Sequence, residues 1–109
     1  MSRQVTPELL DTLIHQIVEL VHPRRIILFG SAARGQMGPH SDLDLLIVMP
    51  DGMPRRQTAQ KIYRGLYGLG IAKDIVVVTE SDVQQYGNNP SLVIYTALRE
   101  GIPLYVAPQ

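Results

Sequence analysis

Apolar residues recur at helical spacing near the beginning of the chain. Between residues 7 and 21 they fall three or four positions apart, which is typical of a helix with one buried face. Thr6 and Pro7 favour a start at this point, because threonine caps a helix and proline fits its first turn. The helix is expected to end at His22, since a residue that precedes a proline, here Pro23, avoids helical geometry.

Four segments of apolar and β-branched residues predict strands. Three of them span about 25–29, 43–49 and 73–79. The fourth, 102–106, contains Pro103 and is expected at an edge of a sheet, because proline cannot donate a hydrogen bond to a neighbouring strand.

Two more helices are expected between and after these strands. One opens at Pro54 and runs to about Tyr67. Its predicted apolar stripe consists of Ala59, Ile62, Tyr63 and Leu66. The other runs from 89–90 to Glu100, and Gly101 is expected at the C′ position just past its end.

Helices that alternate with strands predict an α/β (α+β) fold, in which helices pack on a small mixed β-sheet. The length predicts a single domain over residues 1–109. Ten basic and ten acidic side chains cancel, so net charge gives no reason to expect direct binding to nucleic acid or to a membrane surface.

The absence of cysteine excludes thiol catalysis, disulfides and cysteine-bound zinc, and it fits a reducing compartment. The chain shows no signal core and no apolar run of membrane-spanning length. The expected location is therefore the cytoplasm.

Candidate chemistry gathers between the first two predicted strands. Gly30 and Ser31 follow the first strand, and Asp42 and Asp44 stand at the start of the second. Residues two apart on a strand point to the same face, with α-carbons roughly 6–7 Å apart. Paired carboxylates repel unless a cation lies between them, and oxygen ligands of this kind suit Mg²⁺ together with substrate phosphates. The pair therefore indicates a metal site for phosphate chemistry.

Asp74, near the start of the third predicted strand, is a candidate third acid. If that strand lies beside the second, its carboxylate joins Asp42 and Asp44, where it can complete a second metal position or accept a proton from an attacking hydroxyl. Alone, each aspartate has an ordinary explanation as a solvated strand end or cap. Their combination with a glycine-serine turn favours a functional site.

The turn after the first strand predicts a phosphate-binding side. Glycine at position 30 permits close backbone approach, and a short helical turn over 31–35 would present N–H groups to an anion. The Ser31 hydroxyl can donate to a phosphate oxygen. Arg34 could reach a triphosphate or could be an ordinary surface side chain, and Ser41 could orient a neighbouring carboxylate.

The sequence does not match two other catalytic motifs, the P-loop and the catalytic triad. Gly30 and Gly35 have the spacing of a P-loop, but Gln36 and Met37 stand where lysine and serine or threonine are required. The histidine, serine and aspartate at 40–42 are consecutive, and neighbours along a chain cannot converge as a catalytic triad.

Gly-Ser, ten residues, then Asp-X-Asp, with a further aspartate on a later strand, resembles the DNA polymerase beta-like nucleotidyltransferase superfamily. The chain is most similar to its minimal nucleotidyltransferases, the MNT domains. The similarity extends over nearly the whole chain and is clearest over 27–35, 41–47, 74–76 and 98–105. It implies the polymerase beta-like nucleotidyltransferase fold, and no catalytic position departs from the family pattern.

This resemblance implies Mg²⁺-dependent transfer of a nucleotidyl group from a nucleoside triphosphate, with ATP as the expected substrate. Asp42 and Asp44 would bind two Mg²⁺ ions. Asp74 would help to hold the second ion and favour deprotonation of the acceptor hydroxyl. Gly30 and Ser31 would anchor the β- and γ-phosphates as pyrophosphate leaves.

The resemblance also implies a partner. Short members of this family often pair with a HEPN-domain chain, a ribonuclease toxin, and act as its antitoxin, in some systems by adenylylating a tyrosine of the toxin. We therefore expect a hetero-oligomer whose second subunit supplies contacts that larger relatives find in an additional domain. Tyr63, Tyr67 and Tyr95 are candidates for such contacts or for packing at the edge of the core.

Two alternatives stay open at this point. The chain could be a non-catalytic nucleotide-binding antitoxin that neutralises its partner by occlusion. It could also transfer a nucleotide to a small molecule such as an aminoglycoside, as larger relatives do. The retained Asp74 favours transfer over binding alone, and the short chain disfavours a small-molecule acceptor.

Overall fold

A computed structural model describes residues 6–35 and 42–108 of the chain. In chain order the elements are α1 (Pro7–Val21), β1 (Arg25–Phe29), α2 (Gly30–Ala33), β2 (Leu43–Met49), α3 (Arg55–Leu66), the 3-10 turn η1 (Tyr67–Leu69), β3 (Lys73–Thr79), α4 (Glu80–Tyr86), α5 (Val93–Glu100) and β4 (Ile102–Val106). The predicted mixed α+β fold is confirmed. Within the described ranges, none of the helices combines the length and the apolar content needed to cross a membrane.

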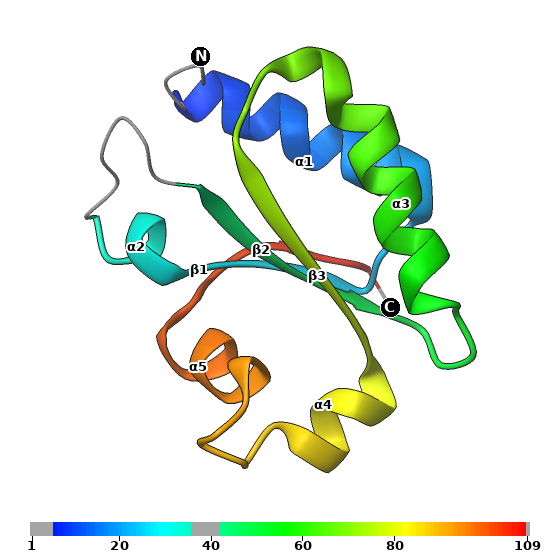
Figure 1. The fold of residues 1–109 in the computed structure, drawn as a ribbon, viewed down its shortest axis with the longest axis vertical. Coiled ribbons are helices and arrows are strands. Elements are labelled where there is room, and N and C mark those ends of the chain that lie inside the picture. Colours follow the sequence, from blue (N-terminus) through cyan, green and yellow to red (C-terminus); the bar gives the residue numbers. More distant parts are fainter. Residues whose placement is uncertain (1–5, 36–41, 109) are drawn as a thin grey trace.

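The four strands form one mixed sheet in the order β3-β2-β1-β4 (Figure 1). β1 is antiparallel to β2 and to β4, whereas β2 and β3 are parallel. The end of β1 and the beginnings of β2 and β3 therefore meet at the same end of the sheet. At this end Phe29 pairs with Asp44, and Asp44 pairs with Asp74. The sheet thus places the turn after β1 next to both acidic strand starts.

Helices cover both faces of this sheet (Figure 1), with α1 and α3 on one face and α4 and α5 on the other. β2 runs through the middle and contributes to both cores. Its odd-numbered residues join the core under α1 and α3, and Leu46 and Val48 join the core under α4 and α5. Burial on both faces explains why 43–49 is a nearly continuous apolar run. Asp44 has the parity of Leu46, so its side chain lies on the α4 and α5 face.

The predicted boundaries of α1 are confirmed. The Thr6 side chain accepts a hydrogen bond from the Leu9 N–H at 3.1 Å, and Pro7 occupies the first turn. The helix stops at Val21, and His22 adopts a left-handed φ of 51° before Pro23.

The buried stripe of α3 differs from the prediction. It consists of Thr58, Ile62 and Leu66, while Tyr63 keeps 39% of its surface exposed. Thr58 can be buried because its hydroxyl donates to the Pro54 carbonyl oxygen at 2.8 Å. Tyr63 therefore lies at the border of the core rather than within it.

The segment after β3 holds an unexpected helix, α4. Thr79 and Asp82 form a capping box, in which each side chain accepts a hydrogen bond from the other residue's N–H. α4 ends at Tyr86, and α5 begins only at Val93 rather than at 89–90, with turns between the two helices. Gly101 directly follows the end of α5, as predicted, and its backbone is extended, with φ −77° and ψ 163°, rather than left-handed.

Gly101 is needed for close packing instead. A Cβ at this position would overlap the carbonyl oxygens of Ala97 and Leu28 and the Ile27 side chain. The absence of a side chain thus lets the end of α5 lie against β1.

Two carboxylates tie the opposite end of the sheet together. Asp51, after β2, accepts hydrogen bonds from the Ser81 N–H at 2.8 Å and from the Ser81 hydroxyl at 2.6 Å. Asp82 forms an ion pair with Arg55 at 2.9 Å. The bonds from Ser81 lower the pKa of Asp51, and the Thr79 N–H, with help from Arg55, lowers the pKa of Asp82.

Acid is expected to weaken this end of the fold. Because both pKa values are lowered on folding, the stabilisation is complete above the ordinary value of 3.8 and is lost as the pH falls below it. An Asp51→Asn, Asp82→Asn double variant should melt a few degrees lower at neutral pH and lose less stability on acidification. Melting curves between about pH 7 and pH 3 test this. Asp11→Asn, on the exposed side of α1, is the control, and parallel profiles for the double variant and the wild type would contradict the prediction.

Candidate active site

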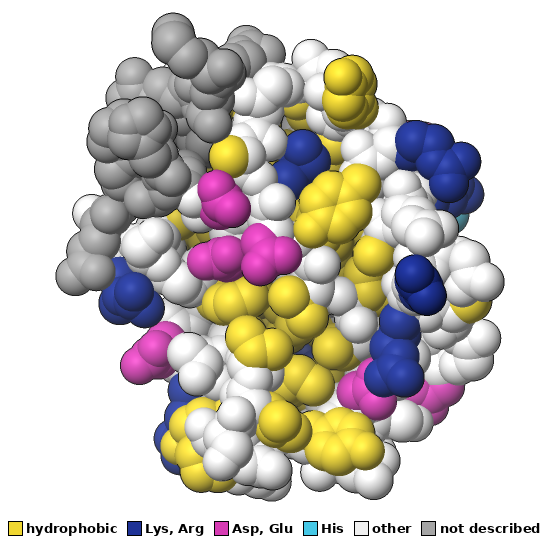
Figure 2. Space-filling model, in the orientation of Figure 1, with side chains coloured by type: hydrophobic (Ala, Val, Ile, Leu, Met, Phe, Trp, Pro, Cys, Tyr) yellow, Lys and Arg dark blue, Asp and Glu magenta, His cyan; other side chains and the backbone are white. Residues whose placement is uncertain are grey.

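The parallel pairing of β2 with β3 brings the candidate acids side by side. Asp44 and Asp74 are register partners on neighbouring strands, which lie about 4.8 Å apart in a sheet. Asp42 directly precedes β2 and is two residues before Asp44, so their side chains are expected on the same face. Figure 2 shows acidic side chains gathered in one patch on the side of the molecule that it views. The expectation that β3 lies beside β2 is therefore confirmed.

Asp44 is the acid most affected by its surroundings. Burial raises its pKa, and the charges of Asp74 and Asp42 raise it further, while the Arg34 guanidinium lowers it. The effect on Asp44 means that the other two carboxylates are close enough to repel it. Such a cluster gains from a bound cation, which replaces repulsion by attraction.

Gly30 is shaped to the Asp44 carboxylate. Because Phe29 pairs with Asp44, the chain leaves β1 directly beside this acid. Gly30 turns with a φ of 73°, and a Cβ at this position would overlap the Asp44 side chain. Both the backbone conformation and the available space therefore require glycine here.

Two more residues of the predicted phosphate-binding turn, Ser31 and Arg34, lie in or just after α2. Ser31 is half-buried in α2, which is a single helical turn. Arg34 is exposed just after this turn, where its N–H lies 3.3 Å from the Gly30 carbonyl oxygen, and its charge reaches Asp44. Ser41 lies outside the described residues. The structure thus brings Gly30 and Arg34 to the acids.

The donor chemistry of the cluster fits a hard divalent cation such as Mg²⁺. Across residues 6–35 and 42–108, no three histidine or carboxylate side chains are arranged as a complete metal-binding group. Mg²⁺ does not need one, because it usually takes one or two carboxylates and completes its shell with phosphate oxygens and water. Asp42 and Asp74 are exposed and Asp44 is half-buried, so all three remain accessible from solvent.

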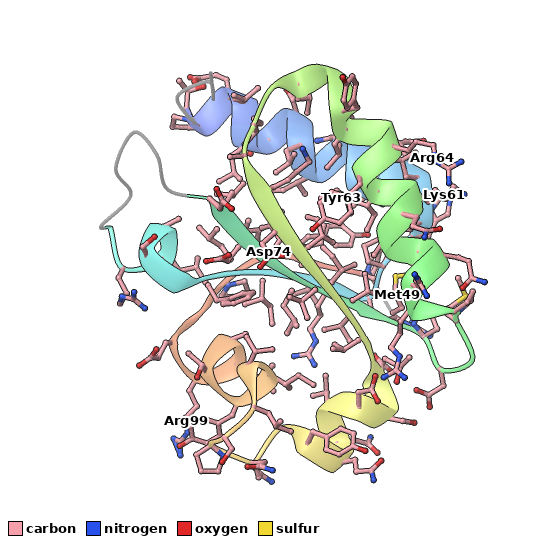
Figure 3. The ribbon with its side chains drawn as sticks, viewed as in Figure 1. Met49, Lys61, Tyr63, Arg64, Asp74 and Arg99 are labelled. Atoms are coloured by element: carbon pink, nitrogen blue, oxygen red, sulfur yellow. The ribbon has the colours of Figure 1, made fainter. Side chains whose placement is uncertain are left out.

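Sequence reasoning did not connect Tyr63 with this cluster. Its hydroxyl oxygen accepts a hydrogen bond from the Ile75 N–H at 2.8 Å, one residue after Asp74. Figure 3 shows Tyr63 on α3 and Asp74 on the adjacent β3. No sequence signal marks this contact, because it depends on how a helix packs against a strand 12 residues away.

The sequence profile of the nucleotidyltransferase domain matches residues 10–102, which is most of the chain. The protein belongs to the nucleotidyltransferase family. The match confirms the superfamily resemblance of the glycine-serine turn and the paired aspartates. No curated protein matches this nucleotidyltransferase in sequence.

Solved structures share the fold of this nucleotidyltransferase at low sequence identity. A candidate nucleotidyltransferase from Sulfolobus solfataricus is 18% identical with a TM-score of 0.62, covering 91% of this chain and 78% of its own. A toxin-antitoxin structure with AMP-PNP is 20% identical with a TM-score of 0.59, covering 91% and 75%. A mutant of the toxin-antitoxin MntA-HpeT is 18% identical with a TM-score of 0.57, covering 96% and 77%. These similarities establish a common fold.

Gly30→Ala should destabilise the nucleotidyltransferase more than Gly35→Ala does. Both glycines have a positive φ, near 70°, so alanine strains the backbone at either position by roughly 1–2 kcal/mol. Only at Gly30 would the new Cβ also meet Asp44, whereas Gly35 has open space around it. Urea unfolding of the two variants measures the difference. Equal losses would mean that Asp44 does not lie against the turn.

Asp44→Asn is expected to stabilise the metal-free protein. The raised pKa of Asp44 means that its contribution to stability falls as the pH rises from the ordinary value through the raised one, so the charged form is a cost at neutral pH. Asparagine keeps the shape and removes the charge, which should raise the melting temperature in EDTA by a few degrees. Asp51→Asn, the same chemical change at a hydrogen-bonded carboxylate, should lower it. A lower melting temperature for Asp44→Asn would contradict the repulsion.

Proposed function

We propose that this protein is an Mg²⁺-dependent nucleotidyltransferase that transfers AMP from ATP to a hydroxyl of a partner protein. The acceptor is a tyrosine of a HEPN-domain toxin, and the transfer makes the protein an antitoxin in a cytoplasmic hetero-oligomer. The adjacency of Asp44 and Asp74 across the β2–β3 pair carries this proposal. A third acid beside the pair is what transfer needs and what nucleotide binding alone does not.

Each residue of the site has a role in this proposal. Asp42 and Asp44 hold Mg²⁺, which when bound neutralises phosphate charge and stabilises the leaving pyrophosphate. Gly30 leaves room for the Asp44 carboxylate, which a Cβ at this position would overlap, and its backbone can approach the triphosphate closely. Ser31 donates its hydroxyl to a phosphate oxygen, and Arg34 approaches the same charges from the end of α2.

Asp74 acts on the acceptor. Its side chain is exposed on the edge strand β3, so an acceptor hydroxyl can approach it from solvent. Asp74 takes the hydroxyl proton while the oxygen attacks the α-phosphorus. The bond between the α-phosphorus and the bridging oxygen breaks, pyrophosphate leaves with that oxygen, and AMP stays attached to the acceptor through a new phosphodiester bond.

Two structural neighbours support the nucleotide and the partner. One is a toxin-antitoxin assembly with AMP-PNP, a non-hydrolysable analogue of ATP. In the other, two aspartates two positions apart are replaced by glutamate. Asp42 and Asp44 have the same spacing in this chain. The shared spacing and the shared fold support an ATP-dependent antitoxin.

Transfer of label to the partner tests this function. The protein is incubated with Mg²⁺, ATP labelled at the α-phosphate and the product of the neighbouring reading frame. We expect labelled partner, and a loss of about a hundredfold or more in Asp42→Asn and Asp44→Asn, because each removes a metal ligand. Asp11→Asn on α1 is the matched control and should keep full activity.

The alternative is a non-catalytic antitoxin that binds nucleotide and blocks its partner by occlusion. Neutralisation of the toxin that survives Asp42→Asn and Asp44→Asn, with no label on the partner, would favour occlusion and contradict transfer.

A further inference from the structure

The outer edge of β3 carries a side-chain hydrogen bond one residue away from Asp74. β3 lies at the margin of the sheet, so N–H groups that point away from β2 meet no neighbouring strand. The N–H of Ile75 is one of these, and it donates to the Tyr63 hydroxyl oxygen at 2.8 Å. The N–H of Thr79 is another, and it donates to an Asp82 carboxylate oxygen at 2.9 Å. Side chains from α3 and α4 thus accept the hydrogen bonds that a further strand would accept at these two points.

Tyr63 is directed to this edge by the packing of α3. Ile62 and Leu66 of the same helix are fully buried, which fixes the rotation of α3 over β3. Tyr63 itself stays partly exposed. Figure 3 shows it on α3, beside β3. An N–H at an exposed sheet edge can bond to water at little cost, so overall stability gives only a weak reason for a tyrosine here.

We propose that Tyr63 is a positioning residue for Asp74, an inference that rests on the nucleotidyl transfer proposed above. Asp74 is the second residue of β3, close to a strand end, where ladders open most easily. Hydrogen bonds secure the strand on both sides of this acid. The Leu43 N–H of β2 donates to the Ala72 carbonyl oxygen at 2.9 Å, and Tyr63 accepts from the following residue on the outer side. Together they keep Asp74 in register with its partner acid.

Removing the Tyr63 hydroxyl should therefore slow transfer without weakening nucleotide binding. The proposed triphosphate side consists of Gly30 and Ser31 in α2 and of Asp42 just before β2, none of which belongs to β3. A displacement of a catalytic group by about 1 Å can lower the reaction rate on the order of a hundredfold. The rate falls less when the group is only more mobile and still reaches the correct position. For Tyr63→Phe we expect kcat to fall about tenfold, with the KM for ATP within about twofold of wild type.

The test combines kinetics with amide hydrogen exchange on the full chain. Wild type, Tyr63→Phe and Tyr86→Phe are compared, because Tyr86 on α4 is a tyrosine of equal exposure, 39%, outside the site. We expect Tyr63→Phe alone to lower kcat, and its Asp74 amide, which faces β2, to exchange about tenfold faster. The Val78 amide in the same strand is the internal reference and should keep its wild-type rate.

Unchanged kcat in Tyr63→Phe, unchanged exchange at Asp74, or the same effects in Tyr86→Phe would each overturn the inference. If the wild type transfers no label to its partner, the proposed function has failed and the exchange measurement alone decides. Faster exchange at Asp74 in Tyr63→Phe would then support positioning, and an unchanged rate would overturn it.

Discussion

The parallel register between β2 and β3 is the constraint on which the site depends. A slip of one residue would turn Asp74 to the opposite face, since side chains alternate along a strand. The register is set by apolar residues on both sides of β3: Ile75 joins the core under α1 and α3, and Val78 joins the core under α4 and α5. Apolar packing on the two faces of β3 therefore determines where the acids meet.

The charged residues of the site destabilise the folded protein. Asp44 is half-buried beside two other carboxylates, and this raises its pKa and costs stability at neutral pH. The opposite end of the sheet has the reverse electrostatics, because Asp51 and Asp82 accept hydrogen bonds that lower their pKa values. The acids that stabilise the fold, Asp51 and Asp82, thus lie at the opposite end of the sheet from the acids that can bind a cation. Structural and functional charges are commonly separated in this way.

Much of this arrangement could be predicted from the sequence. The limits of β2 and β3 follow from apolar runs bounded by proline, glycine and aspartate, and the shared face of Asp42 and Asp44 follows from strand periodicity. The adjacency of Asp74 could only be stated conditionally, because pairing between strands is set by tertiary packing. The helix α4 was missed although Thr79 and Asp82 have capping-box spacing, and the role of Tyr63 left no local signal at all.

The most direct measurement is the broadening of amide NMR signals by Mn²⁺, which binds the same oxygen ligands as Mg²⁺, in the presence of a non-hydrolysable ATP analogue. A cation held by Asp42 and Asp44 should broaden the amides of Gly30, Leu45 and Ile75 and leave those of Asp51 and Ser81 sharp. Broadening centred on Asp51 and Ser81, or spread evenly over the surface, would contradict a cation site at the start of β2 and β3.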